Sequence, residues 1–286
     1  MTIAFERVLL WEPKGCEEGV RPLKLFARVN WRAFGYSGRK ERNGLIPKLR
    51  AACAPMILTL LIAGARADSL PLPGNLTGFS THEGEAYFAE SDARAAYFPL
   101  ASNFVTQKTQ SYCGVATIVM VLNALGLPAP AAPEYTPYRT FTQDNVLSER
   151  TDAVLPRETL ARQGMTLDQI GGVLATEPVH AEVRHAADSS ADEFRKLASA
   201  YLAQPGRFVI VNYLRKALGE EIGGHISPLA AYDAKADRFL ILDVARYKYP
   251  PVWVKTADLF AAMNTPDAAN GGKSRGFVLV TAASHQ

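Results

Sequence analysis

The chain has 286 residues, 48% of them hydrophobic, and is therefore long and apolar enough to bury one large core or two modest ones. Three cysteines are too few for a disulfide framework or a four-thiolate zinc site. The net charge of +3 would favour nucleic acid or a membrane surface as a partner if it were evenly spread, but the first 67 residues carry +7 and the remaining 219 carry −4. The basic charge that would favour such partners is therefore confined to the N-terminal segment.

The end of this basic segment has the three parts of a secretory signal peptide. A positive stretch ends at Arg50, an apolar run follows at residues 51–63, and a small-x-small site ends at Ala67. The run is shorter than the roughly 20 apolar residues that span a bilayer, and its proline fits poorly with the alternative of a buried helix. We therefore expect a signal peptide at residues 45–67 and export to the periplasm. Residues 1–44 would be a dispensable or wrongly assigned extension.

Downstream of the signal peptide, the first half of the chain predicts helices. Residues 115–125 are apolar on nearly every face, as in a fully buried helix, and a glycine and a proline follow that would end it. Thr166 is placed to cap a helix at residues 167–174. Residues 191–202 have the periodicity of an amphipathic helix.

The second half of the chain predicts strands, with one helix at residues 256–263 between them. The strands are short β-branched or aromatic runs separated by turns, at residues 207–214, 225–232, 238–244 and 276–281. Helices followed by antiparallel strands indicate an α+β fold, in which an N-terminal helical part packs on a C-terminal antiparallel β part.

Cys113 is the candidate nucleophile. It lies in the first turn of the buried helix, where unpaired N–H groups and the helix dipole favour a thiolate. Cys16 and Cys53 precede the expected cleavage site, so Cys113 would be the single cysteine of the mature protein. A single cysteine in an oxidising compartment has no partner for a structural disulfide within its own chain. The alternative is a buried cysteine that acts as a small hydrophobic residue.

His225 and Asp243 supply the partners that a cysteine nucleophile needs. They lie on two predicted strands joined by a turn, so the carboxylate could face the imidazole and fix its tautomer. The alternatives are a core histidine and an edge-strand aspartate. Gln107 precedes Cys113 by six residues and could donate its side-chain N–H to an oxyanion, as in cysteine hydrolases of the papain type. The chain order Gln, Cys, His, Asp is the papain-like order.

At this level of detail the sequence resembles a known family, the phytochelatin synthases. The stretches that look like their catalytic domain are residues 104–116, 119–125, 223–228 and 243–254, within a similarity that covers residues 84–280. The resemblance implies a papain-like fold for residues 68–286 and attack of Cys113 on the Cys–Gly bond of glutathione. Glycine would leave a γ-glutamylcysteinyl enzyme, which passes its acyl group to water or to a second glutathione. Cys113, His225 and Asp243 would be the triad, and Gln107 the oxyanion donor.

One departure from the plant enzymes bears on the reaction. Those enzymes have a second, cysteine-rich domain, whereas no cysteine follows Cys113 here, so we expect the short bacterial-type form. That form acts mainly as a hydrolase with weak transpeptidation. No cofactor or stoichiometric metal site is expected, and cadmium or zinc would stimulate the reaction only as a metal-thiolate form of the substrate. His180 and His185 are poorly spaced as ligands on one strand face, and we expect them at the surface.

Glutathione has two carboxylates and one amine, so its site should offer cations and polar groups. The residues that we expect to bind it are Arg246, Arg215, Asn212, Gly224, Tyr112 and Lys248. The alternative for the cations is that they are solvated charges on loops.

Two other functions stay open, a papain-like peptidase that processes leader peptides and a non-catalytic periplasmic module that binds thiols or metals. A homodimer is compatible with the sequence.

Overall fold

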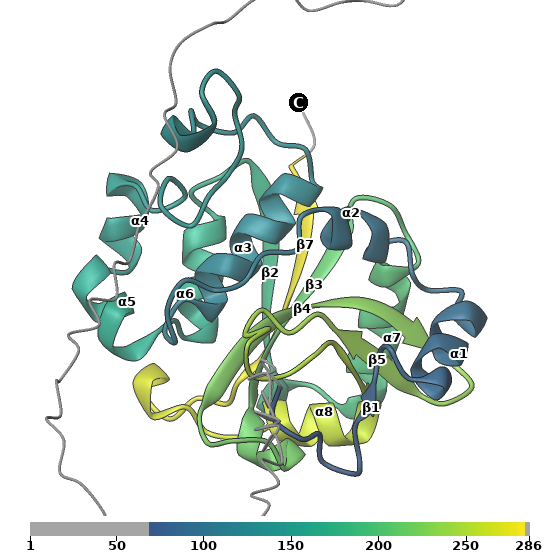
Figure 1. The fold of residues 1–286 in the computed structure, drawn as a ribbon. Coiled ribbons are helices and arrows are strands. Elements are labelled where there is room, and N and C mark those ends of the chain that lie inside the picture. The colour runs from purple at the N-terminus through teal and green to yellow at the C-terminus, as the bar shows by residue number, and fades with distance from the viewer. Residues whose placement is uncertain (1–68, 284–286) are drawn as a thin grey trace, which may run out of the picture. The chain divides into compact units, whose positions relative to one another are not determined.

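One seven-stranded antiparallel sheet organises residues 69–283, the part of the chain that the computed structural model describes (Figure 1). The strand order is β1-β6-β5-β4-β3-β7-β2. The strands are β1 (Thr77–Gly78), β2 (Val179–His185), β3 (Arg207–Leu214), β4 (Gly224–Asp233), β5 (Arg238–Ile241), β6 (Val252–Lys255) and β7 (Gly276–Ala282). The α+β class expected from the sequence is confirmed. The expected extension and signal peptide lie outside the described residues.

The described residues also form eight α-helices (Figure 1). They are α1 (His82–Glu90), α2 (Tyr97–Ser102), α3 (Cys113–Ala124), α4 (Glu149–Val154), α5 (Arg157–Gln163), α6 (Leu167–Leu174), α7 (Ala191–Leu202) and α8 (Thr256–Met263). Helix α3 packs on β4 and α6 on β2, while α7 and α8 contact each other and β3. No helix among them is long and apolar enough to cross a bilayer.

Several elements have the bounds that the sequence predicts. Helices α6, α7 and α8 and strand β3 match their predicted ranges, and α3 is buried from Cys113 to Leu122. Thr166 caps α6 as expected, because its Oγ1 accepts a hydrogen bond from the backbone N–H of Gln169 at 3.3 Å. The Gln169 side chain accepts in return from the Thr166 backbone N–H at 2.9 Å, which completes a capping box.

The strand expected at residues 238–244 is shorter than predicted, and this changes the pairing around His225. Strand β5 ends at Ile241, so Asp243 lies beyond the ladder and does not face His225 across a hairpin. His225 instead pairs with Tyr213 of β3. The physical reason is Pro228 in β4, whose carbonyl accepts from Leu242 N at 3.1 Å but which has no N–H to return.

The expected order, helices first and then strands with one helix between them, misses two strands: β1 precedes every helix, and β2 lies between α6 and α7. Strand β2 pairs along its whole length with β7, about one hundred residues later, from Val179 opposite Ala282 to His185 opposite Gly276. His180 is exposed as expected, but the His185 side chain is only 15% exposed because Asp168 and Ser274 hold both its ring nitrogens.

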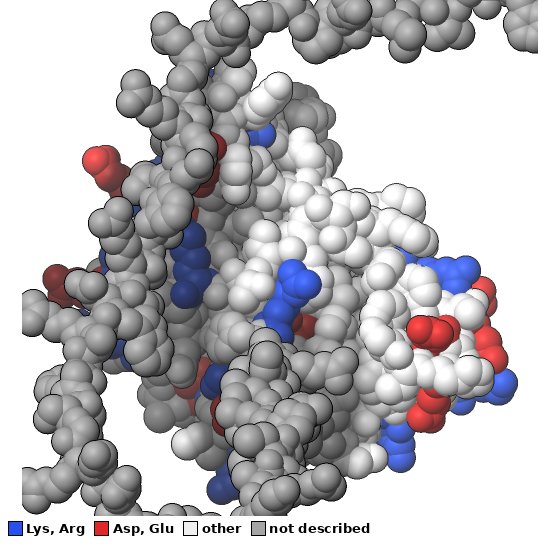
Figure 2. Space-filling view, in the orientation of Figure 1, with Lys and Arg blue, Asp and Glu red and all other residues white. Residues whose placement is uncertain are grey.

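The surface of the described part has charges of both signs. Over α1 and its neighbours in Figure 2, acidic and basic side chains are intermingled, whereas the surface over α2 and α3 is largely uncharged. Glu90 of α1 pairs there with Lys235 at 3.1 Å. The basic excess of the whole sequence is thus not a feature of this face.

Candidate active site

The fold places Cys113 at the first position of α3, where it is buried with 7% of its surface exposed. Burial by itself raises the pKa of this thiol, but the hydrogen bond and positive charge of His225 lower it more, with help from the Ile226 and Gly114 backbone. The net pKa is therefore lowered, and the thiolate is favoured. Gly114 lets Met165 pack closely here, because a Cβ at this position would lie 2.7 Å from its Sδ atom.

His225, on β4, contacts three functional groups. Its Nε2 lies 2.9 Å from Asp243 Oδ1 and 2.9 Å from Ser227 Oγ, which leaves Nδ1 for the hydrogen bond with Cys113. Burial lowers the pKa of the imidazole, but the Asp243 carboxylate raises it above its usual value. A lowered thiol pKa beside a raised imidazole pKa favours the thiolate–imidazolium pair. The Tyr213 ring packs against the imidazole in a T-shaped arrangement, with the ring centroids 5.7 Å apart.

Asp243 is completely buried and kept ionised by its neighbours. Burial raises its pKa, but the charge and hydrogen bond of His225, followed by those of Arg215, lower it to about 2. Its oxygens accept from Arg215 Nη2 at 3.0 and 2.7 Å and from the backbone N–H of Ala245 at 2.8 Å. The carboxylate can therefore orient the imidazole without taking its proton.

Arg215 corrects one expectation, because its guanidinium is not free to bind a substrate. The side chain is 4% exposed and reaches two buried carboxylates, that of Asp243 and that of Glu220, whose Oε2 lies 2.6 Å from Nη1. The short 3-10 helix η3 (Arg215–Leu218) directs this arginine inward after β3, and the Tyr249 ring stacks on it at 5.0 Å. Its observed contacts support Asp243 rather than a ligand.

Gln107 lies beside the triad although it is far from His225 and Asp243 in the sequence. Its backbone N–H donates to Val244 O at 3.0 Å, next to Asp243. Its Nε2 donates to Thr109 O at 2.7 Å and to the Tyr247 hydroxyl at 3.1 Å, so both amide hydrogens are engaged. The oxyanion role stays a prediction, and it requires the bond to Tyr247 to open.

A cavity of about 130 Å³ gives access to the thiol. Cys113 and His225 line it, together with Asn212 and Gly224, which are therefore placed as expected for substrate contacts. A second cavity of about 410 Å³ shares Gln110, Ser111 and Gln163 with the first and includes Tyr112. The two cavities adjoin, so a ligand longer than one amino acid could extend from the first into the second.

Two of the expected cations line neither cavity. Arg246 stacks on the Phe104 ring at 4.6 Å, and Lys248 forms an ion pair with Glu221 at 3.0 Å. Their solvated or paired state matches the alternative that the sequence left open for them.

The cation that does line the first cavity was missed in the sequence. Arg275 is 9% exposed, and its Nε is buried without a hydrogen-bond partner, close to Gly224. Its Nη1 donates to Pro266 O at 2.6 Å, and its Nη2 lies 3.6 Å from Asp267, which also lines the cavity. A buried cation and a carboxylate side by side suit a zwitterionic amino-acid group. Only a turn signal, Asn-Gly-Gly at residues 270–272, marks this hairpin in the sequence.

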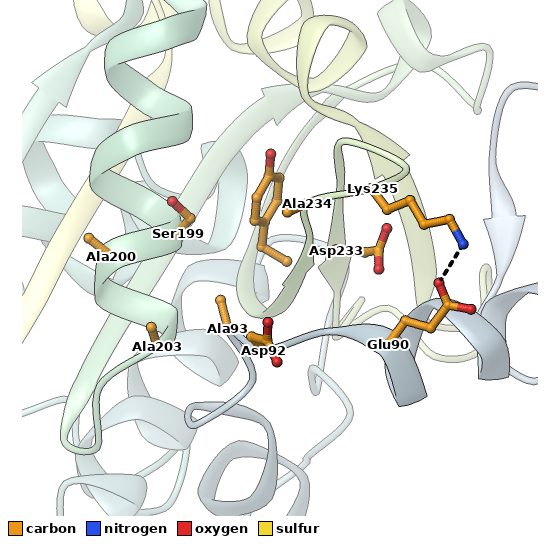
Figure 3. Close-up of a pocket in the computed structure, with 10 residues that line it drawn as sticks. Glu90, Asp92, Ala93, Ser199, Ala200, Ala203, Asp233, Ala234 and Lys235 are labelled. Carbon is orange, nitrogen blue, oxygen red and sulfur yellow. Dashed lines mark hydrogen bonds and ion pairs between the residues drawn. The ribbon is translucent and has the colours of Figure 1, made fainter.

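A further cavity of about 520 Å³ (Figure 3) lies at the opposite end of β4 from His225. At about 3.3 Å per residue, the two ends are about 25 Å apart along the strand. Its lining includes Tyr232, small side chains of α7, and the ion pair between Glu90 and Lys235. Neither a cysteine nor a histidine lines it. The nucleophile and its base therefore mark the smaller cavity as the candidate active site.

Comparison with known proteins identifies the family of this chain. The sequence model of the family described as phytochelatin synthase matches residues 67–277. The chain belongs to the phytochelatin synthase family. It is 35% identical over 222 residues to glutathione gamma-glutamylcysteinyltransferase 3 of Lotus japonicus, an alignment that covers 77% of this chain and 45% of the relative.

Other relatives of this phytochelatin synthase family member have the same enzyme name. Identity is 33% to glutathione gamma-glutamylcysteinyltransferase 1 of Arabidopsis thaliana, over 78% of this chain and 45% of that protein. It is 30% to the enzyme of Schizosaccharomyces pombe, over 64% of this chain and 43% of that protein. The chain thus spans less than half the length of the curated relatives it matches.

The described part of this phytochelatin synthase family member was searched for side chains that could hold a metal ion together. Within residues 69–283, no group of three or more His, Cys, Asp and Glu side chains is arranged to bind one. His185, Asp168 and Lys273 do form a cluster near the cavity, but it includes a lysine and its hydrogen bonds are internal.

Proposed function

We propose that this chain cleaves the Cys–Gly bond of glutathione through a γ-glutamylcysteinyl enzyme on Cys113, mainly with water as the acceptor. The observation that carries the proposal is the pairing of a buried thiol with an imidazole whose Nε2 lies 2.9 Å from Asp243, at a cavity that also contains Arg275. A cysteine at the start of a buried helix, packed beside an antiparallel sheet that carries the histidine, supports a papain-like fold.

The first half of the reaction forms the acyl enzyme. The Cys113 thiolate attacks the cysteinyl carbonyl carbon, and the resulting oxyanion accepts hydrogen bonds from the Cys113 backbone N–H and the Gln107 amide. The His225 imidazolium then gives its proton to the glycine nitrogen. The C–N bond breaks, glycine leaves, and a thioester joins γ-glutamylcysteine to Cys113.

The second half regenerates the thiolate. Neutral His225 takes a proton from water while the water oxygen bonds to the thioester carbonyl. The C–S bond then breaks, which releases γ-glutamylcysteine and restores the thiolate beside the imidazolium. When the thiol peptide glutathione enters instead of water, its amine attacks the same carbonyl, and the product is a phytochelatin. Weak transpeptidation of this kind is part of the proposal.

The γ-glutamyl end of glutathione fits the charges in the cavity. Its α-carboxylate would bind the Arg275 guanidinium, and its α-amine would approach Asp267. Asn212 and Gly224, which line the same cavity, would contact the peptide. Cadmium or zinc would act as part of a metal-thiolate substrate, with no cofactor of the protein required.

The experiment that tests the proposal follows glycine release from glutathione. The wild-type protein should release glycine and, after rapid quenching, should gain the mass of one γ-glutamylcysteinyl group, whereas Cys113→Ser should do neither. Equal glycine from both proteins, or none from the wild type, would refute the enzyme. Cleavage of a leader peptide in place of glutathione would favour the peptidase, and thiol or metal binding without turnover would favour the non-catalytic module.

Export is a separate part of the proposal, supported only by the sequence pattern before Asp68. N-terminal sequencing of the protein from the periplasm should begin at Asp68. A mature protein that begins at Thr2 would refute both the signal peptide and the dispensable extension.

A further inference from the structure

The hairpin loop at residues 264–275 joins α8 to β7 and carries Asp267 and Arg275 into the cavity, and we call it the substrate strap. Its two arms are tied together by the bridge between Pro266 and Ser274 and by the bond from Asp267 N to Lys273 O at 2.8 Å. These bonds lie within the strap. They shape it but do not fix its position against the rest of the protein.

Three side chains outside the cavity supply part of that attachment. His185 Nδ1 lies 2.6 Å from Ser274 O, and His185 Nε2 lies 2.7 Å from Asp168 Oδ1. Lys273 Nζ donates to the other oxygen of Asp168 at 2.8 Å. Asp168 lies in the first turn of α6, so this clasp of His185, Asp168 and Lys273 joins the strap to α6 and β2.

The two contacts of His185 require a charged ring. A backbone carbonyl and a carboxylate are both acceptors, so both ring nitrogens must donate, and only the imidazolium has two N–H groups. A neutral ring would turn a lone pair toward one of the two oxygens and lose that bond. The backbone bonds from Ala186 N to Arg275 O and from Ala187 N to the Ser274 hydroxyl would then remain, each at 2.9 Å.

We propose that His185 is a positioning residue, which in its protonated form holds the substrate strap so that Arg275 and Asp267 meet the substrate. Ser274, whose carbonyl His185 binds, directly precedes Arg275, so a shift of this peptide moves the guanidinium. The part that concerns glutathione rests on the proposed function, whereas the hold on the strap does not.

The charged groups around His185 are consistent with this role. Asp168 faces it from α6 and Lys273 from the strap, and the two form an ion pair with each other. On β2 itself, Arg184 points to the opposite face and pairs with Glu182 and with Glu193 of α7. Partial burial raises the pKa of the Asp168 carboxyl, but the hydrogen bonds from Lys273 and His185 lower this pKa overall. Asp168 therefore stays ionised and can accept a hydrogen bond from a protonated His185 ring.

The first test compares His185→Gln with His180→Gln by hydrogen exchange at about pH 6. Glutamine keeps one donor but has no charge, and exposed His180 on the same strand is the matched control. We expect amides of the substrate strap, such as those of Asp267 and Gly272, to exchange at least about fivefold faster in His185→Gln only. Unchanged exchange in the strap would overturn the proposal, whatever the enzyme activity.

The second test measures glycine release at about pH 6 and about pH 8.5. The KM for glutathione of His185→Gln should exceed that of the wild type about fivefold at the lower pH, with kcat changed less than twofold. A neutral ring, like glutamine, can donate to only one of the two acceptors, so the ratio should fall toward one at the higher pH. A ratio that stays constant with pH, or a change in kcat alone, would assign His185 a merely structural role and refute the proposal.

A second variant covers the case in which His185→Gln does not fold. Asp168→Asn keeps an acceptor for the ring but removes the charge that Lys273 and His185 share, so it should accelerate exchange in the substrate strap in the same way. If neither the wild type nor the variants release glycine, the proposed function is refuted. The hydrogen-exchange results still show whether His185 holds the substrate strap.

Discussion

Replacement of Arg215 by methionine tests whether this residue supports Asp243 or binds substrate. In the structure its guanidinium is 4% exposed and makes charged hydrogen bonds to Asp243 at 3.0 and 2.7 Å and to Glu220 at 2.6 Å. Methionine fills much of the same volume but leaves buried Glu220 without its cation and Asp243 with His225 as its remaining charged partner. Removal of one partner from a buried ion pair costs about 3–5 kcal/mol.

The assay is urea unfolding of four proteins at about pH 7, namely the wild type, Arg215→Met, Asp243→Asn and the double variant. We expect Arg215→Met to lower the free energy of unfolding by about 3–5 kcal/mol. The cycle should give a coupling of about 1.5–3 kcal/mol between the two residues, because two of the three bonds go to Asp243.

Activity separates the two roles of Arg215. If the residue supports Asp243, the folded variant should lose kcat, because Asp243 no longer holds the imidazole in place. A loss of less than about 0.5 kcal/mol in stability together with a higher KM at unchanged kcat would refute this reasoning and restore the substrate-binding role.

Three further outcomes follow from the same cluster. Cys113 should react with iodoacetamide well below about pH 8.5, the ordinary thiol pKa, and a labelling rate that rises only above that pH would contradict a lowered pKa. The pKa of Asp243 is lowered to about 2 in the folded state, so its contribution to stability is present above the unfolded value near 3.8 and lost as the pH falls through about 2. The stability difference between wild type and Asp243→Asn should therefore shrink by about 2 kcal/mol from about pH 5 to about pH 2, as measured by unfolding at each pH. Ser227→Ala removes the hydroxyl that lies 2.9 Å from His225 Nε2, and we expect kcat to fall about tenfold, whereas Thr117→Val, which removes another buried hydroxyl of the same region, should keep kcat within about twofold.

The elements that sequence could predict are those whose signals are local. The cap at Thr166, the amphipathic period of α7 and the β-branched run of β3 each determine an element within a few residues. Strand β2 escaped prediction because only two of its seven residues, both valine, are β-branched, and it depends on β7 for its hydrogen bonds. The early end of β5 depends on a proline in a different strand.

The residues of the candidate site also fall into those that a local sequence signal predicts and those that it does not. Cys113 could be predicted as a nucleophile because its place at a helix start is a local property, and His225 and Asp243 because a buried carboxylate near a histidine needs a partner. Arg215 and Arg275 could not be told from solvated cations, since charge is visible in a sequence and burial is not. The structure buries both, one behind Asp243 and the other in the cavity.

These two arginines define opposite sides of the candidate nucleophile. Arg215 neutralises Asp243 from the protein interior, and Glu220, whose pKa is raised by burial in spite of the Arg215 charge, shares that cation. Arg275 lines the cavity, and its buried Nε has no hydrogen-bond partner within the described residues. A substrate carboxylate that enters the cavity therefore meets a cation that the triad does not use. Under the proposed function, substrate binding and orientation of the imidazole would depend on different charges, so variants of Arg275 should raise KM while variants of Arg215 lower kcat.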